Sequence, residues 1–232
     1  MPIQIINTEQ AVRDDGVKVL LYGAAGTGKT TSSITAPAPL ILSAESGLLS
    51  IRSSRLPVIE VRSYNEVREA YDWFLRAPDA RKNVRTIVVD SLSEVLEVVL
   101  QNEKAGTRDP RQAYGALIDK GIPLIKSFRD LPGYNVIMIA KEFKATDNFG
   151  IIKATPRAPG QNLGIELPYL FDLVARASIG RDQNGQPFHF FQCRADNLAE
   201  AKDRSGALEM MEPPHWEYIF SKMRGATFGK MQ

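Results

Sequence analysis

Residues 23–30 read GAAGTGKT and lie between an apolar stretch, VKVLLYG (17–23), and a helical stretch that begins at KTTSSIT. They fit GxxxxGKS/T at every fixed position, with a strand before the motif and a helix after it, which is the context the motif requires. Glycines at 23, 26 and 28 let the backbone wrap closely around phosphate oxygens. Backbone N–H groups and the helix N-terminus supply positive potential for those oxygens. The stretch predicts a nucleotide-binding phosphate loop, and the alternative is a glycine-rich turn that matches by chance.

Two side chains of this loop have predicted chemical roles. Lys29 can reach the β- and γ-phosphate oxygens, and the Thr30 hydroxyl can ligate Mg²⁺. ATP is favoured over GTP because no NKxD or TKxD motif follows a later strand. We therefore expect ATP and Mg²⁺ as cofactors. The residues of the loop expected to bind them are Gly23, Ala24, Ala25, Gly26, Thr27, Gly28, Lys29, Thr30 and Thr31.

Carboxylates are predicted at the ends of two other strands. Asp90 ends the buried strand RTIVVD (85–90), where a carboxylate can hold Mg²⁺ through water. Ser91 stands where many ATPases carry a glutamate, and Ser91 with Glu94 fits a capping box at the start of the next helix. Glu45 follows the strand LILSA (40–44), and the carboxyl ends of parallel strands meet at one edge of a sheet. We expect Glu45 to orient or deprotonate the water that attacks the γ-phosphate, the alternative being a solvated loop acid.

Strand-like and helix-like segments alternate along the chain, which predicts an α/β protein with a mostly parallel sheet flanked by helices. Further strands are expected at PVIEVR (57–62) and NVIMIA (135–140), and helices over 63–77, after Asp90, over 111–131 with Pro123 as a kink or break, and around 216–223. A long polar loop is expected over 141–164, and DLVARASIG and PFHFFQCR predict a C-terminal antiparallel hairpin. We expect one domain over 1–232, with a core of about 17–206, a short N-terminal segment (1–16) and a C-terminal helix (214–224).

Composition places few further limits on function. The 232 residues carry a net charge of +2, so the overall charge does not indicate a nucleic-acid-binding protein. One cysteine, Cys193, excludes an intrachain disulfide and is typical of a reducing compartment, and two histidines argue against a structural zinc site. The N-terminus lacks the pattern of a signal peptide, and no apolar run is long enough to span a membrane. We expect a cytoplasmic protein that is not bound to a membrane. His189 is assigned no chemistry.

Several stretches together resemble the RecA-like ATPases, and more closely the small phage-encoded RecA-like recombination ATPases that act in single-strand annealing and homologous recombination. They extend over most of 17–206 and include VKVLLYGAAGTGKTT, LILSAESGL, TIVVDSLSEV, Tyr114-Gly115, NVIMIAKE, PRAPG before LPYLFDLVARA, and AKDRSG. The resemblance implies an ATP-dependent, DNA-stimulated ATPase that binds single-stranded DNA in the cytoplasm of the host cell. The chain is much shorter than a full recombinase and shows no added DNA-binding domain, which favours annealing or assistance to a partner over complete strand exchange.

The resemblance also implies roles for residues in the second half of the chain. A polar residue that ends the strand after Asp90 senses the γ-phosphate in such proteins, and here it is Lys141 or Glu142. Lys202 and Arg204 are similar to a Lys-x-Arg element that RecA-like ATPases insert into a neighbouring subunit's site, where it stabilises transition-state charge. The alternative is two solvated cations. The trans role implies a homo-oligomer, either a ring or a filament.

By the same resemblance, single-stranded DNA is expected at the loops of this sheet edge. Predicted contacts from the 141–164 loop are Lys144, Lys153 and Arg157, with Phe143 and Phe149 able to stack on bases. The other candidate region surrounds Lys104, Arg108 and Arg111. A single-strand-binding protein is a partner that such proteins can require. Two rival functions stay open, a small-molecule phosphotransferase such as a nucleotide kinase and an ATP-gated DNA scaffold with incidental hydrolysis.

Overall fold

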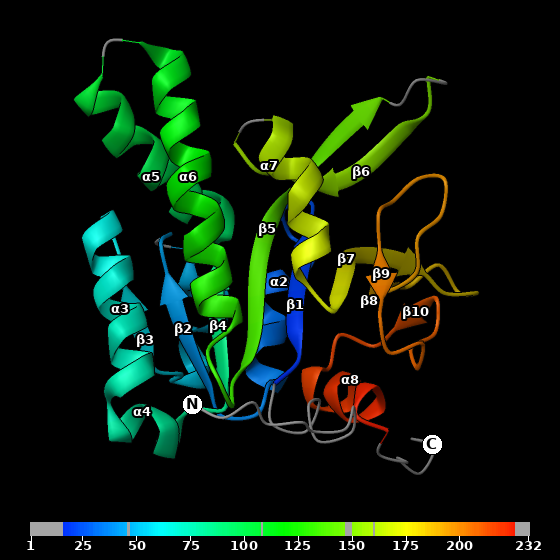
Figure 1. Cartoon of the computed structure of the whole chain (residues 1–232). Coiled ribbons are helices and arrows are strands. Elements are labelled where there is room, and N and C mark those ends of the chain that lie inside the picture. Colours follow the sequence, from blue (N-terminus) through cyan, green and yellow to red (C-terminus); the bar gives the residue numbers. More distant parts are fainter. Residues whose placement is uncertain (1–15, 46, 108, 147–149, 160, 226–232) are drawn as a thin grey trace, which may run out of the picture.

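A sheet with the strand order β10-β8-β7-β1-β5-β4-β2-β3 runs through the computed structural model, which describes residues 16–45, 47–107, 109–146, 150–159 and 161–225 (Figure 1). The five strands from β7 to β2, and the edge strand β3, pair in parallel, whereas β8 and β10 pair antiparallel. The strands are β1 (Lys18–Gly23), β2 (Pro39–Ser43), β3 (Val58–Glu60), β4 (Thr86–Asp90), β5 (Asn135–Thr146), β7 (Leu173–Arg181), β8 (Pro187–Gln192) and β10 (Met211–Glu212).

Helices cover both faces of the sheet, which explains why its central strands are apolar along their whole length. On one face lie α3 (Tyr64–Arg76), α4 (Pro78–Asn83), α5 (Leu92–Gly106) and α6 (Pro110–Arg129), which pack on the side chains of Leu20 and Tyr22. On the other face α8 (Trp216–Met223) packs on Val19 and Leu21. Side chains alternate between the faces along β1, as they do in any strand. The predicted fold class is confirmed.

The helix that follows the phosphate loop is short. It comprises α2 (Lys29–Ser32) and a 3₁₀ turn (Ser33–Thr35), and it ends before the APAP segment as the sequence predicts. The fully buried Trp216 of α8 donates its indole N–H to Ser32 Oγ at 3.0 Å, and its backbone N–H to Thr35 Oγ1 at 2.9 Å. The C-terminal helix therefore packs directly against the end of α2 and stabilises it.

Two helices begin at the predicted serine caps. Ser63 Oγ accepts a hydrogen bond from the backbone N–H of Glu66 at 3.2 Å, and Ser91 Oγ accepts one from Glu94 N–H at 3.3 Å. The reciprocal half of the capping box does not form on α5, because the Glu94 carboxylate forms an ion pair with Lys141 instead. The serine caps are confirmed, and Glu94 has a second partner that the sequence did not indicate.

The prediction of a long loop over 141–164 is wrong for the described residues. β5 continues to Thr146 and pairs antiparallel with β6 (Ile152–Pro156), so that a hairpin projects beyond the main sheet (Figure 1, upper right). The short helix α7 (Gln161–Glu166) and a 3₁₀ turn (Leu167–Leu170) follow it. The end of β5 extends away from the core and so carries polar residues, and for this reason it lacks the apolar pattern that predicts a buried strand.

Pro123 lies inside α6, which is continuous over its 20 residues, so it does not break the helix. The C-terminal hairpin is confirmed as β7 and β8, with Gly185 at a φ of 77° in the connecting turn. β9 (Lys202–Asp203) adds a short antiparallel pairing to β7. Among the described helices, none has both the length and the apolar character that a membrane crossing requires.

Candidate nucleotide-binding site

The phosphate loop connects β1 to α2 in the conformation that its glycines permit. Gly26 and Gly28 have φ values of 78° and 83°, in the left-handed region that favours glycine. A Cβ at Gly23 would lie 2.5 Å from the carbonyl oxygen of Ala177, so the neighbouring strand β7 also requires glycine there. The loop lies at the carboxyl end of β1, where Gly23 pairs with Lys141 of β5 and Tyr22 pairs with Arg176 of β7.

Lys29 lies over the loop with its ammonium group bound to two of the loop's own carbonyl oxygens. Lys29 Nζ donates to the oxygens of Gly23 at 2.8 Å and Ala24 at 2.7 Å. Burial lowers the pKa of Lys29 from its ordinary value, and the nearby carboxylate of Asp90 opposes that shift. Phosphate oxygens can replace the carbonyls as partners of this ammonium group, which would restore a charged partner to a partly buried cation.

Thr30 and Asp90 form the arrangement expected of a magnesium site. Thr30 Oγ1 donates to Asp90 Oδ2 at 2.6 Å, although the two residues come from α2 and β4. Asp90 is only 7% exposed, and this burial raises the pKa of its carboxyl group while the Thr30 hydrogen bond opposes the rise. A hydroxyl and a carboxylate fit Mg²⁺, which takes few protein ligands and keeps waters and phosphate oxygens for the others.

Glu45 lies beside this pair because β2 and β4 are neighbouring parallel strands, with Ser43 opposite Asp90. Glu45 Oε1 accepts a hydrogen bond from Ser91 Oγ at 2.7 Å and lies 3.3 Å from Lys141 Nζ. Ser91, 3% exposed, therefore both caps α5 and orients the carboxylate of Glu45. The structure brings Glu45 to the expected sheet edge, and its catalytic role stays a prediction.

Lys141 and Glu142, the two candidates for a γ-phosphate sensor, have different partners. Lys141 Nζ forms ion pairs with Glu94 and Glu45, and the bond to Glu94 raises the pKa of Lys141. Glu142 accepts from Arg176 Nε at 2.9 Å. Both line one cavity of about 370 Å³, together with Gly23, Ala24, Ala25, Lys29, Thr30, Glu45, Asp90, Ser91, Ile139, Ala140 and Arg157.

Lys202 and Arg204 lie away from this cavity. They belong to or follow β9, which pairs with the beginning of β7 next to the amino-terminal half of β1. Lys202 Nζ donates to Pro168 O at 2.5 Å, and Arg204 bonds Asp172 Oδ1 at 3.2 Å. Neither side chain therefore contributes to the site of its own chain, and a role in a neighbouring subunit's site stays a prediction.

The predicted DNA contacts divide between the two faces of the β5–β6 hairpin. Phe143 pairs with Thr155 and Ala145 pairs with Lys153, so Phe143 and Lys153 share a face, because directly opposite residues point the same way. Lys144 pairs with Ala154 and lies on the other face. Phe143 is 55% exposed and lines a groove of about 680 Å³ between the hairpin, α6 and α7.

The other candidate DNA contacts lie partly outside the described residues, as Arg108 and Phe149 do. Lys104 Nζ lies 5.4 Å from the ring centroid of Tyr114, and Arg111 is exposed.

Sequence reasoning missed two contacts of the site. His189 Nδ1 lies 3.2 Å from the carbonyl oxygen of Thr27, and a Cβ at Gly28 would lie 3.3 Å from the same nitrogen. His189 thus packs on the phosphate loop, a contact that the sequence did not indicate, although no chemistry is assigned to it. Arg157, predicted to bind DNA, also lines the nucleotide cavity. No sequence signal indicated either contact, because both depend on strand pairing across the fold.

Comparisons with known proteins give one family match and several similar structures. A family model described as an AAA domain matches residues 15–205. No curated protein matches the chain. Among solved structures, the chain is similar to a prototypical ATPase from the type III secretion system of pathogenic bacteria, with 15% identity over 71% of this chain and 52% of that one and a TM-score of 0.47. The flagellar accessory protein FlaH from Methanocaldococcus jannaschii is similar at 10% identity over 77% of this chain and 78% of that one, with a TM-score of 0.39. The chain spans about half the length of the first of these. From the match over 15–205, the chain belongs to the AAA domain family of P-loop ATPases.

Proposed function

We propose that this protein is a Mg²⁺-dependent ATPase that binds single-stranded DNA and acts in DNA annealing and homologous recombination. The observation that carries the ATPase part is one cavity that collects Lys29, the Thr30–Asp90 pair and Glu45 from three different strand ends. A phosphate-binding cation, oxygen ligands for a metal ion and an oriented carboxylate are the groups that hydrolysis of a phosphoanhydride needs.

Each group has a defined part in binding. The N–H groups of the loop and of α2 hold the β-phosphate, and Lys29 turns from the Gly23 and Ala24 carbonyls to the phosphate oxygens. Thr30 and Asp90 hold the metal ion. Mg²⁺ bound there would neutralise charge on the β- and γ-phosphate oxygens. Lys141 is the better placed candidate for the γ-phosphate sensor, since it lies beside Glu45 whereas Glu142 is held by Arg176.

Glu45 acts on the attacking water. The water oxygen forms a bond to the γ-phosphorus, the bond from phosphorus to the bridging oxygen breaks, and Glu45 accepts the proton that the water loses. Ser91 donates to Glu45 Oε1, which leaves the other carboxylate oxygen available to the water. The products are ADP and inorganic phosphate, and the serine next to Asp90 acts as a positioning residue where another ATPase would carry the base itself.

The DNA part of the proposal is supported by the resemblance to phage-encoded recombination ATPases and by the hairpin. An exposed Phe143 and Lys153 on one hairpin face suit unpaired strands, which are bound by stacking and by phosphate contacts. Arg157 and Lys144 are further candidate contacts. Lys202 and Arg204 complete a neighbouring subunit's site in a ring or filament in the cytoplasm, and a single-strand-binding protein is an accessory partner.

The test is the ATPase rate with and without single-stranded DNA, measured across protein concentration. The proposal predicts a rate that rises with added single-stranded DNA and a rate per protein molecule that rises with concentration, since neighbouring subunits complete the site. Lys29→Ala is the control for phosphate-loop turnover. A wild-type ATPase rate no higher than that of Lys29→Ala would overturn the proposed ATPase activity. An ATPase rate that does not change when single-stranded DNA is added would overturn the proposed role in recombination.

A further inference from the structure

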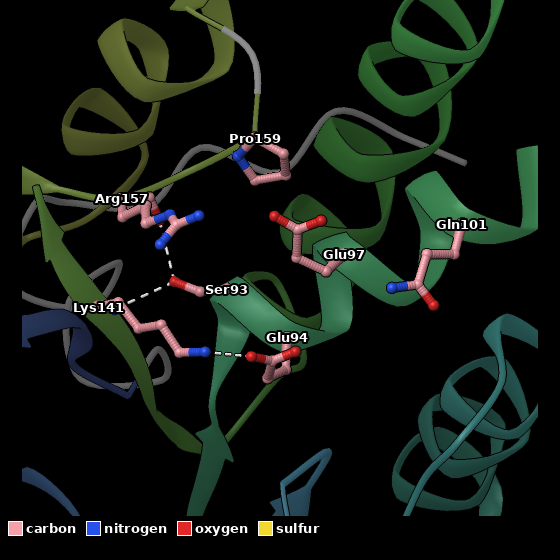
Figure 2. A pocket seen from close by; sticks show the side chains of 7 residues that line it. All are labelled: Ser93, Glu94, Glu97, Gln101, Lys141, Arg157 and Pro159. Carbon is pink, nitrogen blue, oxygen red and sulfur yellow. Dashed lines mark hydrogen bonds and ion pairs between the residues drawn. The ribbon is translucent and has the colours of Figure 1, made fainter. Parts of the chain in front are cut away.

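Arg157 lies where three cavities adjoin. It lines the nucleotide cavity of about 370 Å³, the groove of about 680 Å³ under the hairpin, and a third pocket of about 240 Å³. The third pocket is lined by Ser93, Glu94, Glu97, Gln101, Lys141, Arg157 and Pro159 (Figure 2). Figure 2 shows Arg157 and Lys141 on one side of this pocket, with the α5 residues Glu94 and Glu97 on the other.

The backbone of Arg157 is fixed beside the site. Arg157 N–H donates to the carbonyl oxygen of Lys141 at 2.7 Å, and the Arg157 carbonyl accepts from Ser93 Oγ at 3.0 Å. The same Ser93 oxygen accepts from Lys141 N–H at 3.0 Å (Figure 2). Ser93 lies in the first turn of α5, two residues after Ser91, and is 3% exposed. One buried hydroxyl therefore joins the base of the hairpin to the segment that carries the magnesium carboxylate.

The side chain of Arg157 is exposed and available to a ligand. Within the described part of the chain, its guanidinium group makes no hydrogen bond or ion pair, whereas the Lys141 ammonium is engaged by both Glu45 and Glu94. A phosphate that binds the Lys141 ammonium must compete with the carboxylates of Glu45 and Glu94. A phosphate that binds the Arg157 guanidinium displaces only solvent. A guanidinium group also presents two parallel N–H donors that match phosphate oxygens.

We propose that Arg157 is a γ-phosphate-binding residue supplied by the same chain, held in place through Ser93. The inference rests on the proposed ATPase function and adds a cation to its nucleotide site. Arg157 then distinguishes a nucleoside triphosphate from a diphosphate, because a diphosphate lacks the γ-phosphate that Arg157 binds. With Arg157 on the γ-phosphate, Lys141 can contact the same group without giving up its pair with Glu45, so Glu45 would keep the orientation that Ser91 gives it.

The test measures nucleotide affinity in the absence of DNA for the wild-type protein, Arg157→Ala, Arg157→Lys and Lys144→Ala. The probes are ADP and a non-hydrolysable ATP analogue, each with Mg²⁺, by calorimetric titration. Lys144→Ala is the matched control, since it removes an exposed cation of the neighbouring hairpin that does not line the nucleotide cavity, and DNA is absent from the assay. Thermal unfolding is recorded for every variant, and little change is expected because the Arg157 side chain is exposed and unpaired.

Arg157→Ala is expected to weaken binding of the ATP analogue by about 10- to 100-fold, as for the loss of a charged hydrogen bond, and ADP binding by less than about 2-fold. Arg157→Lys should recover part of the loss, because it keeps the charge and loses the paired donors. Equal losses for both nucleotides, or no loss for either, would overturn the inference.

Two further outcomes separate this inference from the function on which it rests. Unchanged nucleotide affinity together with weaker binding of a fluorescent single-stranded oligonucleotide by Arg157→Ala would assign Arg157 to DNA and overturn the inference alone. A wild-type protein that binds the ATP analogue with no response to DNA would overturn the recombination role, while a triphosphate-specific loss in Arg157→Ala would still support the inference.

Discussion

The double role of Ser91 gives the prediction with the sharpest control. Ser91→Ala removes the hydrogen bond to Glu45 Oε1 at 2.7 Å and the helix cap on Glu94 N–H at 3.3 Å. Loss of a serine cap costs about 1 kcal/mol of folding stability. A hydrogen bond to a charged group contributes about 1.5–3 kcal/mol, so a Glu45 that depends on Ser91 for its orientation would lose about 10- to 100-fold in kcat.

Ser63 provides the matched control for the cap. The Ser63 hydroxyl caps α3 by accepting a hydrogen bond from Glu66 N–H at 3.2 Å, and Ser63 does not line the nucleotide cavity. The assay pairs steady-state ATP hydrolysis with thermal unfolding for Ser63→Ala, Ser91→Ala and Ser91→Thr. Both alanine variants should unfold at lower temperatures, Ser91→Ala by more than Ser63→Ala because it also loses the bond to Glu45. Only Ser91→Ala should lose kcat, with KM for ATP changed by less than about 3-fold, and Ser91→Thr should regain activity because threonine keeps the hydroxyl.

Equal kcat values for Ser91→Ala and Ser63→Ala would show that Ser91 acts only as a cap and would refute its role in orienting Glu45. A loss of ATP affinity in Ser91→Ala in proportion to its loss of rate would also refute that role, because it would indicate damage to the phosphate loop or to the Thr30–Asp90 pair.

The remaining predictions concern pH, the phosphate loop and the core. Burial raises the pKa of Asp90 above its ordinary value of 3.8, so within that pH window the folded protein holds a proton that the unfolded chain has released. Denaturant titrations should therefore show the free energy of unfolding falling as pH rises through the window. Asp90→Asn should remove this pH dependence and should also abolish the stabilisation of the protein by Mg²⁺ with ATP. His189→Ala should weaken ATP binding about 5-fold through the lost contact with Thr27, and an unchanged affinity in calorimetry would refute that role. Burial raises the pKa of Cys193 to about 12, so a thiol reagent should label it only after unfolding, and rapid labelling of the native protein would contradict the packing of β8.

The core of the fold follows from patterns that the sequence displays directly. Continuous apolar strands at 18–23, 86–90 and 135–140 predict a sheet covered on both faces, and Ser63 and Ser91 mark helix starts that the structure confirms. Glu45 could be located at the shared edge because the carboxyl ends of parallel strands meet there, even though 45 residues separate it from Asp90.

What the sequence could not indicate depends on pairing between distant segments. The β5–β6 hairpin is polar because it extends beyond the main sheet, and its sequence therefore predicted a loop rather than two strands. His189 contacts the phosphate loop because β8 is placed near β1 by its pairing with β7, which itself pairs with β1. Arg157 enters the nucleotide cavity because Ser93 holds its backbone beside Lys141. Charge alone had grouped Arg157 with Lys144 and Lys153, which the structure separates.

The central claim is that the carboxylate acting on water is Glu45, from the segment that follows β2, across the sheet edge from Asp90. Its most direct test is single-turnover hydrolysis of ATP by Glu45→Gln, with Glu94→Gln as the control because Glu94 is the other carboxylate paired with Lys141. Glu45→Gln should bind ATP as the wild-type protein does and hydrolyse it at least about 100-fold more slowly, while Glu94→Gln stays within a few-fold of wild type. Wild-type turnover in Glu45→Gln, or the loss appearing in Glu94→Gln instead, would contradict the account.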